Sequence, residues 1–271
     1  GTCQDITKEF FLNRELVQLN ESLSRKNNEL LNINRELESF NYIASHDLQE
    51  PLRKIQIYSG RLMEQASEIS EDAKQSIHKV IHSASRMQRL IADLIEFSQI
   101  STKSDAKEAV SLNILIDEVK NNFSHLIEQE NASFNVQQLP HIKVIPFQFS
   151  QLLSNIIGNA LKYKRDGVSP EITITSKTEM VPDEERSNLT SAYWVLSICD
   201  NGIGFDENQK EKIFDLFKRL HSSEKYSGTG IGLAICKKIV NNHNGFIRAD
   251  SQKGEGSCFH IYLPEELLVK Q

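Results

Sequence analysis

The sequence lacks the features that place a protein in a membrane or on nucleic acid. No apolar run approaches the roughly 18–20 residues that a membrane-spanning helix needs, and no signal-peptide pattern opens the chain. The formal net charge is -6, whereas a surface that binds nucleic-acid phosphates is basic. We therefore expect no nucleic-acid partner, no membrane segment in this chain and a cytoplasmic location, although a longer protein could be membrane-anchored upstream.

Cysteine is also scarce, and its spacing argues against cysteine-based sites. The four cysteines, at positions 3, 199, 236 and 258, lie far apart and form no CxxC pair. This spacing predicts neither a zinc site nor a disulfide framework, which suits a reducing cytosol. We expect Cys199, Cys236 and Cys258 to be small hydrophobic residues of a core.

The first 44 residues carry a heptad pattern. Apolar residues recur in alternating steps of four and three, and Lys26 occupies the one seam position that is polar. Such a seam predicts a parallel coiled-coil dimer, in which a charged seam residue can fix the register. A single amphipathic helix packed on a globular core is the alternative. The apolar seam residues are Leu12, Leu16, Leu19, Leu23, Leu30, Ile33, Leu37, Phe40 and Ala44.

A helical hairpin is predicted next. The heptad places Ala44 in the seam, so His46 should face solvent, and Pro51 should kink the helix because it removes a backbone hydrogen bond. The stretch 67–72 (SEISED) is typical of a turn with capping residues, and a second helix with a broad apolar stripe should end near Ile100. Because one hairpin cannot bury this stripe, we expect two copies to form a four-helix bundle.

Beyond a polar linker at 101–107, the sequence mixes helix and strand patterns. They lack the regular alternation of a parallel doubly wound fold, so we predict an α/β sandwich in which helices cover one face of a mixed sheet. The predicted helices are 112–128, 148–162 and 231–240, and the predicted strands are 134–136, 142–145, 172–178, 194–199, 246–249 and 258–263, with a polar loop at 182–188.

One of these helices carries Asn155 and Asn159 four residues apart on one face, with Lys162 and Tyr163 one turn further along. An Asn amide oxygen is a neutral ligand suited to Mg²⁺, whose other ligands are often waters and phosphates. An exposed polar surface is the alternative interpretation of such a pair.

Two glycine-containing stretches follow. In 200–205 (DNGIGF), Asp200 ends a predicted strand and can accept a hydrogen bond from an exocyclic amine, although a simple β-turn is the alternative. The stretch 228–233 (GTGIGL) opens a helix, so its amide groups can face phosphate oxygens. It is neither a Walker A loop nor a dinucleotide fingerprint. Between the two, a segment with Phe214, Phe217 and Arg219 precedes a polar loop at 222–227 that could fold over a nucleotide.

In this order, the stretch 46–52 (HDLQEPL), the Asn helix, DNGIGF, the Phe segment and GTGIGL resemble the H, N, G1, F and G2 boxes of sensor histidine kinases. The resemblance covers the chain from about Glu38 to Pro264. It implies a dimerisation and histidine-phosphotransfer domain followed by an ATP-binding domain of the Bergerat fold, as in gyrase-type ATPases. We expect a coiled-coil signalling helix at 1–37, the phosphotransfer domain at 38–101, a linker at 102–107 and the catalytic domain at 108–271.

The resemblance implies a homodimeric protein-histidine kinase that uses ATP and Mg²⁺ to autophosphorylate His46. Asp47 would accept the Nδ1 proton in a hydrogen bond and leave Nε2 free to attack, while Arg219 would stabilise charge on the γ-phosphoryl group. The phosphoryl group would then pass to an Asp of a response-regulator receiver domain. An upstream sensor domain is expected outside this chain.

The same resemblance implies the nucleotide contacts. Asn159 would hold Mg²⁺ with Asn155 supporting it, and Asp200 would bind the adenine amine. The remaining residues expected at the nucleotide are Lys162, Tyr163, Gly202, Gly204, Gly228, Thr229, Gly230, Gly232 and Leu233.

Two other functions remain open. A gyrase-like ATPase would keep ATP turnover without His46, and a degenerate dimeric scaffold would fail to bind ATP. Members of the family that dephosphorylate their partner carry Thr or Asn four residues after the phosphoacceptor, where this chain has Glu50. An ionised carboxylate cannot donate a hydrogen bond to water, so we expect weak phosphatase activity.

Overall fold

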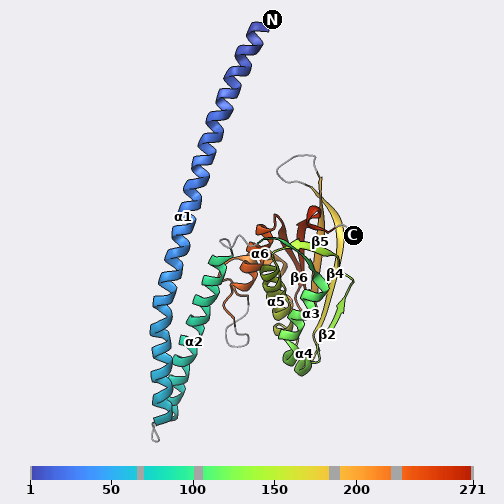
Figure 1. Cartoon of the computed structure of the whole chain (residues 1–271). Coiled ribbons are helices and arrows are strands. Elements are labelled where there is room, and N and C mark those ends of the chain that lie inside the picture. Colours follow the sequence, from blue (N-terminus) through green and yellow to red (C-terminus); the bar gives the residue numbers. More distant parts are fainter. Residues whose placement is uncertain (1, 66–69, 101–105, 183–189, 221–227, 270–271) are drawn as a thin grey trace.

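The structure, a computed structural model, describes residues 2–65, 70–100, 106–182, 190–220 and 228–269, and the side chains of residues 2–13, 28, 30–32, 34–47 and 65 lie outside that description. Two antiparallel helices, α1 (Thr2–Gln65) and α2 (Glu71–Gln99), form a hairpin beside a globular α/β domain (Figure 1). The N-terminal half of α1 extends well beyond the hairpin. None of the described helices is both long and apolar enough to cross a membrane.

The hairpin follows the sequence closely. Ser70 caps α2, since its hydroxyl accepts the backbone N–H of Ala73 at 3.3 Å, and acidic residues occupy the first turn. The helix α1 is unbroken through Pro51. Among the described side chains of the hairpin, Leu52 and Ala84 are the buried apolar ones between the two helices, and several others on each helix, such as Leu62 and Met87, remain exposed. A lone hairpin therefore leaves part of its apolar surface in water, as predicted.

The globular domain is built on a five-stranded mixed sheet in the order β2-β4-β5-β7-β6. Only β2 and β4 are parallel, and every other neighbouring pair is antiparallel. A short ladder of β1 and β3 lies beside it. The strands are β1 (Glu108–Ser111), β2 (Ser133–Val136), β3 (His141–Val144), β4 (Glu171–Pro182), β5 (Thr190–Asp200), β6 (Phe246–Gln252) and β7 (Gly256–Pro264).

Helices cover one face of this sheet (Figure 1). They are α3 (Leu112–Asn122), α4 (Ser124–Glu130), α5 (Pro146–Lys162) and α6 (Gly232–Asn242), with 3₁₀ turns at Glu207–Gln209, Lys212–Phe214 and Glu265–Leu267. The main core lies between the helices and the sheet, where alternate residues of β5 such as Leu196 and Ile198 meet Leu152 and Ile156 of α5. The predicted helical hairpin and α/β sandwich are both confirmed.

Two details of the prediction were wrong. The helix predicted over 112–128 is two helices, because the chain bends at Phe123. The Phe123 ring packs on α5 at Gly158, where an added Cβ would lie 3.2 Å from the ring. The strand β1 was not predicted. The domain boundaries stay a prediction, since α1 runs through residues 37 and 38 without a break.

The cysteine prediction also needs correction. The register of β5 and β7 places Cys199 opposite Cys258, and the two form a disulfide across 59 residues of sequence. The expectation that no disulfide forms and that these two are core residues was therefore wrong. Cys236 behaves as predicted, because it is free and completely buried in the main core.

Candidate active site

A cavity of about 280 Å³ opens between α5, α6, the end of β5 and the end of α2. Polar groups and glycines from stretches that are distant in the sequence meet there, with apolar side chains on the wall nearest the core. Of the predicted residues, those lining it are Asn155, Asn159, Lys162, Tyr163, Asp200, Gly204, Arg219, Gly228, Thr229, Gly230, Gly232 and Leu233.

At one end of the cavity lies the carboxyl group of Asp200, the last residue of β5. Its Oδ1 accepts the backbone N–H of Gly202 at 2.8 Å. Burial raises the pKa of Asp200 to about 6, against the lowering effect of the backbone N–H groups of Gly202 and Ser257. Gly202 lies behind this carboxyl group, where a Cβ would lie 2.5 Å from the carbonyl oxygen of Tyr163, so only glycine fits.

The helix α5 supplies the polar wall. Its apolar face is buried in the core, which leaves Asn155 and Asn159 on the cavity side. Asn155 lies close to the beginning of α6, since a Cβ added to Gly232 would come within 2.9 Å of the Asn155 Oδ1 atom. At the last turn, the Lys162 Nζ donates to the Tyr163 hydroxyl at 3.0 Å and lies over its ring. One helix face therefore presents two amide groups and an ammonium group to the same space.

Opposite this wall, the glycine-rich stretch leads into α6. Gly230 adopts a φ of +79°, and a Cβ there would lie 2.8 Å from the carbonyl oxygen of Lys218. Gly230, Gly232 and Leu233 all line the cavity, so the first turn of this 11-residue helix faces it. A helix N-terminus has unpaired N–H groups and a positive dipole end, which favour an anion such as a phosphate.

Sequence analysis missed the contribution of α2. Asp93 and Glu96 line the same cavity, and the hydroxyl of Thr229 donates to the Asp93 carboxylate. Burial, followed by the neighbouring charge of Asp93, raises the pKa of Glu96. These residues belong to an ordinary amphipathic helix in the sequence, and only the docking of α2 on the globular domain brings them to the cavity.

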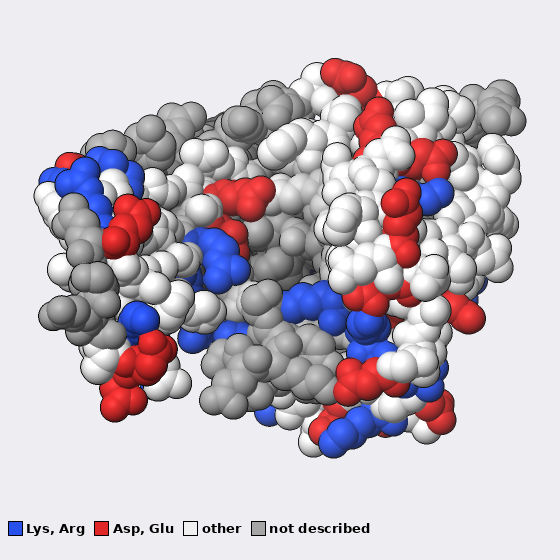
Figure 2. Space-filling model, turned by 90° about the horizontal axis from the view of Figure 1, so that it is seen from below, with Lys and Arg blue, Asp and Glu red and all other residues white. Residues whose placement is uncertain are grey.

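The end of α2 is held against the globular domain by polar contacts. Lys238 of α6 donates to the carbonyl oxygen of Phe97 at 2.6 Å and lies over its ring. Asn242 and Gln148 both donate to the carbonyl oxygen of Ile100, at 2.8 Å and 3.1 Å. Seen from below, Lys and Arg side chains gather with Asp and Glu around the hollow between the hairpin and the globular domain (Figure 2).

The predicted phosphoacceptor is not part of the described cavity. His46 and Asp47 lie on α1, and their side chains are outside the described residues, as is the polar loop predicted at 222–227. Glu50, one turn after His46, forms an ion pair with Lys54 at 2.8 Å. Among the described residues, no group of three or more His, Cys, Asp and Glu side chains is arranged to hold a metal ion.

Residues 36–103 match the His Kinase A (phospho-acceptor) domain, and residues 145–267 match the Histidine kinase-, DNA gyrase B-, and HSP90-like ATPase domain. The second match contains every predicted nucleotide residue, and the first contains His46. The chain belongs to the sensor histidine kinases. It carries the phospho-acceptor domain and the ATP-binding domain of a protein-histidine kinase.

Curated relatives agree with this family assignment. The kinase is 36% identical over 251 residues to Cyanobacterial phytochrome A of Nostoc sp., covering 92% of this chain and 30% of that protein. It is 32% identical over 244 residues to Sensor protein kinase WalK of Staphylococcus epidermidis, covering 87% of this chain and 38% of that protein. The chain thus spans about a third of the length of these relatives.

Solved structures share the fold. The crystal structure of full-length ShkA in complex with AMPPNP matches with a TM-score of 0.57 at 20% identity, covering 83% of this chain and 45% of that chain. The Acinetobacter baumannii histidine kinase AdeS matches with a TM-score of 0.51 at 19% identity, covering 80% of this chain and 98% of that chain. At these identities the likeness shows the fold alone.

Proposed function

We propose that this chain binds ATP in the cavity, transfers the γ-phosphoryl group to His46 and then passes it to an Asp of a separate receiver domain. The observation that carries the proposal is the convergence on one cavity of a strand-end carboxylate, an amide-bearing helix face and a glycine-rich helix N-terminus. Each of these fits a different part of a nucleotide.

The adenine ring fits beside Asp200. Its exocyclic amine can donate to the Asp200 carboxylate, while Ile203 and Phe205 supply apolar surface close to the ring. The φ of +60° at Gly204 and the close packing of its backbone on Gln252 leave no room for a side chain at this position. Adenine is therefore recognised by one buried acceptor and by shape.

The phosphates fit at the other end, between the N-terminus of α6 and the last turn of α5. The Lys162 ammonium lies close to the glycine-rich stretch, since a Cβ on Gly228 would come within 2.7 Å of its Nζ. Lys218 and Arg219 add positive charge on the same side. Phosphoryl transfer depends mainly on alignment and charge neutralisation, which these groups provide.

Mg²⁺ fits the donors of α5. Asn159 would be its protein ligand, and Asn155, held near Gly232, would orient it. A single neutral oxygen ligand suits an ion that takes most of its other ligands from water and phosphate. When bound, the ion would neutralise charge on the β- and γ-phosphate oxygens.

The phosphoacceptor is His46. Its Nε2 would form a bond to the γ-phosphorus as the bond to the ADP oxygen breaks, and Asp47 would hold the Nδ1 proton in a hydrogen bond. Because Asp93 and Glu96 now lie at the phosphate end, their negative charges oppose bound ATP. We infer that the ATPase domain leaves this position on α2 before it reaches His46.

Dimerisation follows from the exposed seam of α1. Leu16, Leu19, Leu23 and Ile33 are each more than half exposed in the single chain, at 57%, 59%, 62% and 54%. Burying such a row against a second copy is the stable arrangement for a heptad helix. A parallel dimer would place two hairpins side by side as a four-helix bundle.

Incubation with Mg²⁺ and γ-labelled ATP tests the proposal, with wild type compared with His46→Gln and Asp200→Asn. We expect an acid-labile label on wild type and none on either variant. His46→Gln should bind ATP as wild type does, whereas Asp200→Asn should bind it roughly 100-fold more weakly. ATP hydrolysis that survives in His46→Gln at the wild-type rate would favour the gyrase-like ATPase, and failure of the wild type to bind ATP would favour the scaffold.

A further inference from the structure

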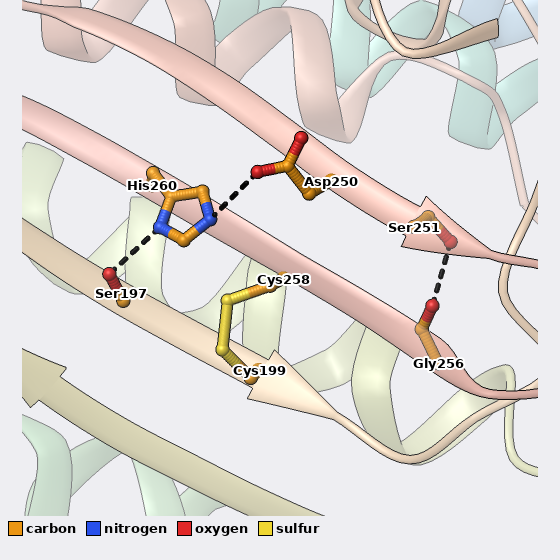
Figure 3. Close-up of a disulfide and its surroundings, with 7 residues drawn as sticks. All are labelled: Ser197, Cys199, Asp250, Ser251, Gly256, Cys258 and His260. Atoms are coloured by element: carbon orange, nitrogen blue, oxygen red, sulfur yellow. Dashed lines mark hydrogen bonds and ion pairs between the residues drawn. A yellow bond between two sulfur atoms is a disulfide. The ribbon is translucent and has the colours of Figure 1, made fainter. Parts of the chain in front are cut away.

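The disulfide lies next to two residues that line the nucleotide cavity. In the ladder of β5 and β7, Cys199 is paired with Cys258, and the following pair is Asp200 with Ser257. Both Asp200 and Ser257 line the cavity, and the backbone N–H of Ser257 bonds the Asp200 carboxylate. The disulfide, drawn in Figure 3, is thus one residue along each strand from the pair that lines the cavity.

The two cysteines face away from the helices. Side chains alternate along a strand, and the neighbours Ile198 and Phe259 belong to the main core on the helix side. Cys199 and Cys258 therefore lie on the opposite face with Ser197 and His260, whose Oγ and Nδ1 atoms are 2.8 Å apart (Figure 3). Both cysteines are only partly buried, unlike the completely buried Cys236.

The two strands are already in close contact at this point. A Cβ added to Gly256 would overlap the carbonyl oxygen of Asp200, so the two backbones lie close together here and only glycine fits. Movement apart is opposed by non-covalent contacts, namely the ladder hydrogen bonds and the Ser197–His260 contact, and fraying is least costly near the strand ends. A covalent bond between Cys199 and Cys258 removes that freedom.

We propose that Cys199 and Cys258 form a thiol–disulfide site that reacts with low-molecular-weight disulfides and sets the affinity of the cavity for adenine nucleotides. This inference rests on the proposed nucleotide binding. In the oxidation step, one cysteine thiolate attacks the reagent disulfide and releases one thiol. The second cysteine then attacks the mixed disulfide, which forms the Cys199–Cys258 bond and releases the other thiol. Two electrons pass from the cysteines to the reagent.

The oxidised form should bind nucleotide more tightly. With the strands tied together, the Asp200 carboxylate and the Ser257 backbone are held in the arrangement that bonds adenine, so less ordering is needed on binding. We expect the dissociation constant for ATP to fall by roughly 5–10-fold on oxidation, at the low end of the range typical of coupling between two sites.

The experiment uses the full chain with Cys3→Ser, which leaves the pair and the buried Cys236 as its cysteines. Samples are equilibrated in reduced and oxidised glutathione at a series of ratios, the disulfide is mapped by peptide mass spectrometry, and ATP binding is measured by calorimetry. Cys199→Ser/Cys258→Ser removes the site, and Cys236→Ser is the matched control because that thiol is completely buried elsewhere in the core.

The proposal predicts that the mapped Cys199–Cys258 bond and the tighter binding appear at the same glutathione ratio. Both should persist in Cys236→Ser, and the double variant should bind ATP with one affinity at every ratio. A disulfide that never forms at any ratio, or one that forms without changing the affinity or that weakens binding, would overturn it. Absence of ATP binding in every state would instead refute the proposed function.

Discussion

At the scale of single residues, the carboxyl group of Asp200 lies between the core of the ATPase domain and the cavity. Burial raises its pKa to about 6, whereas the proposed contact with adenine requires the ionised form. Holding a buried carboxylate ready for a ligand destabilises the free protein, because the backbone N–H groups of Gly202 and Ser257 replace only part of the lost hydration. Binding sites often carry such a cost.

Asp200→Asn should stabilise the nucleotide-free protein at pH 8 by about 1–3 kcal/mol while weakening ATP binding by roughly 100-fold. The amide oxygen still accepts the Gly202 N–H but carries no charge. Because the folded pKa is raised, the stability contributed by Asp200 is present below pH 3.8 and is lost as the pH rises through about 6. Urea titrations of wild type and variant at pH 8 measure the difference. Equal or lower stability of the variant would contradict the burial cost.

The raised pKa of Asp200 also predicts that adenosine binding depends on pH. Protonation of Asp200 below about pH 6 removes its negative charge and turns one carboxylate oxygen into a hydroxyl donor. The affinity for adenosine should therefore fall as the pH drops from 7 to 5. Adenosine is the suitable ligand because it carries no phosphate that titrates in this range. Calorimetry at several pH values measures this affinity. A flat profile would show that the carboxylate does not bind the adenine amine.

His243 is a second buried titratable group, and it has a structural role. Its Nε2 accepts the backbone N–H of Ile145 at 3.0 Å, and its Nδ1 bonds the carbonyl oxygen of Ile239 at 2.8 Å, an arrangement that requires the neutral ring. Burial lowers the pKa of His243. Its contribution to stability is therefore complete above the unfolded pKa of about 6.5 and is lost as the pH falls below it.

His243→Phe should lower the free energy of unfolding at pH 7.5 by about 1–3 kcal/mol, because the Ile145 N–H is left without an acceptor in the core. It should also remove part of the loss of stability between pH 6.5 and 5. Denaturant titrations at both ends of this range measure the two effects. A variant as stable as wild type at pH 7.5 would show that these hydrogen bonds contribute little.

At the scale of elements, the contact between α2 and the ATPase domain brings carboxylates to the proposed phosphate end of the cavity. Asp93 and Glu96 bring negative charge there, and Lys238, Asn242 and Gln148 hold the end of α2 in place. Docking and nucleotide binding therefore oppose each other. A ligand that binds better to the undocked form shifts the population toward it.

Asp93→Asn combined with Glu96→Gln should tighten ATP binding by about 2–10-fold at low salt, because two repulsive charges near the phosphates are removed. Adenosine serves as the control ligand, since it carries no phosphate and its affinity should be unchanged. Calorimetry at low and high salt measures both. If ATP affinity does not change, α2 does not compete with the phosphates.

The elements also show where sequence reasoning succeeds and where it stops. The Asn face of α5, the strand-end Asp200 and the glycine-rich start of α6 are each local patterns, so their positions could be predicted. Their meeting in one cavity was implied only by the resemblance of the whole set to sensor histidine kinases. The carboxylates of α2 could not be predicted, because they reach the cavity only by docking. The cysteine pair depends on the register of β5 and β7, and the bend at Phe123 depends on packing against Gly158. Both are contacts between distant parts of the sequence, so no local pattern predicts them.

At the scale of the whole molecule, the proposed reaction requires that His46 and the nucleotide cavity come together. The long helix α1 carries His46, and the ATPase domain lies against the other helix of the hairpin (Figure 1). The exposed seam of α1 indicates that a second chain completes the assembly. Signals that reach α1 from an upstream domain would act through the geometry of that dimer.

Leu19→Lys should weaken the dimer by about tenfold or more, because it places a charge in the apolar seam. Val17→Lys is the matched control, since Val17 is a similarly exposed apolar residue, at 53%, that lies off the seam of the same helix. Sedimentation equilibrium of the two variants and of wild type measures the dissociation constants. Equal effects at both positions would contradict a heptad dimer.

The central claim is that ATP bound in this cavity phosphorylates His46, and the most direct measurement is the position of the phosphoryl group. After incubation with Mg²⁺ and ATP, peptides prepared at alkaline pH, where phosphohistidine survives, would be sequenced by mass spectrometry. The account predicts phosphate on His46 in wild type and none in Asn159→Ala or Asp200→Asn. Phosphate on another histidine such as His78 or His82, or ATP turnover that leaves His46 unmodified, would contradict it.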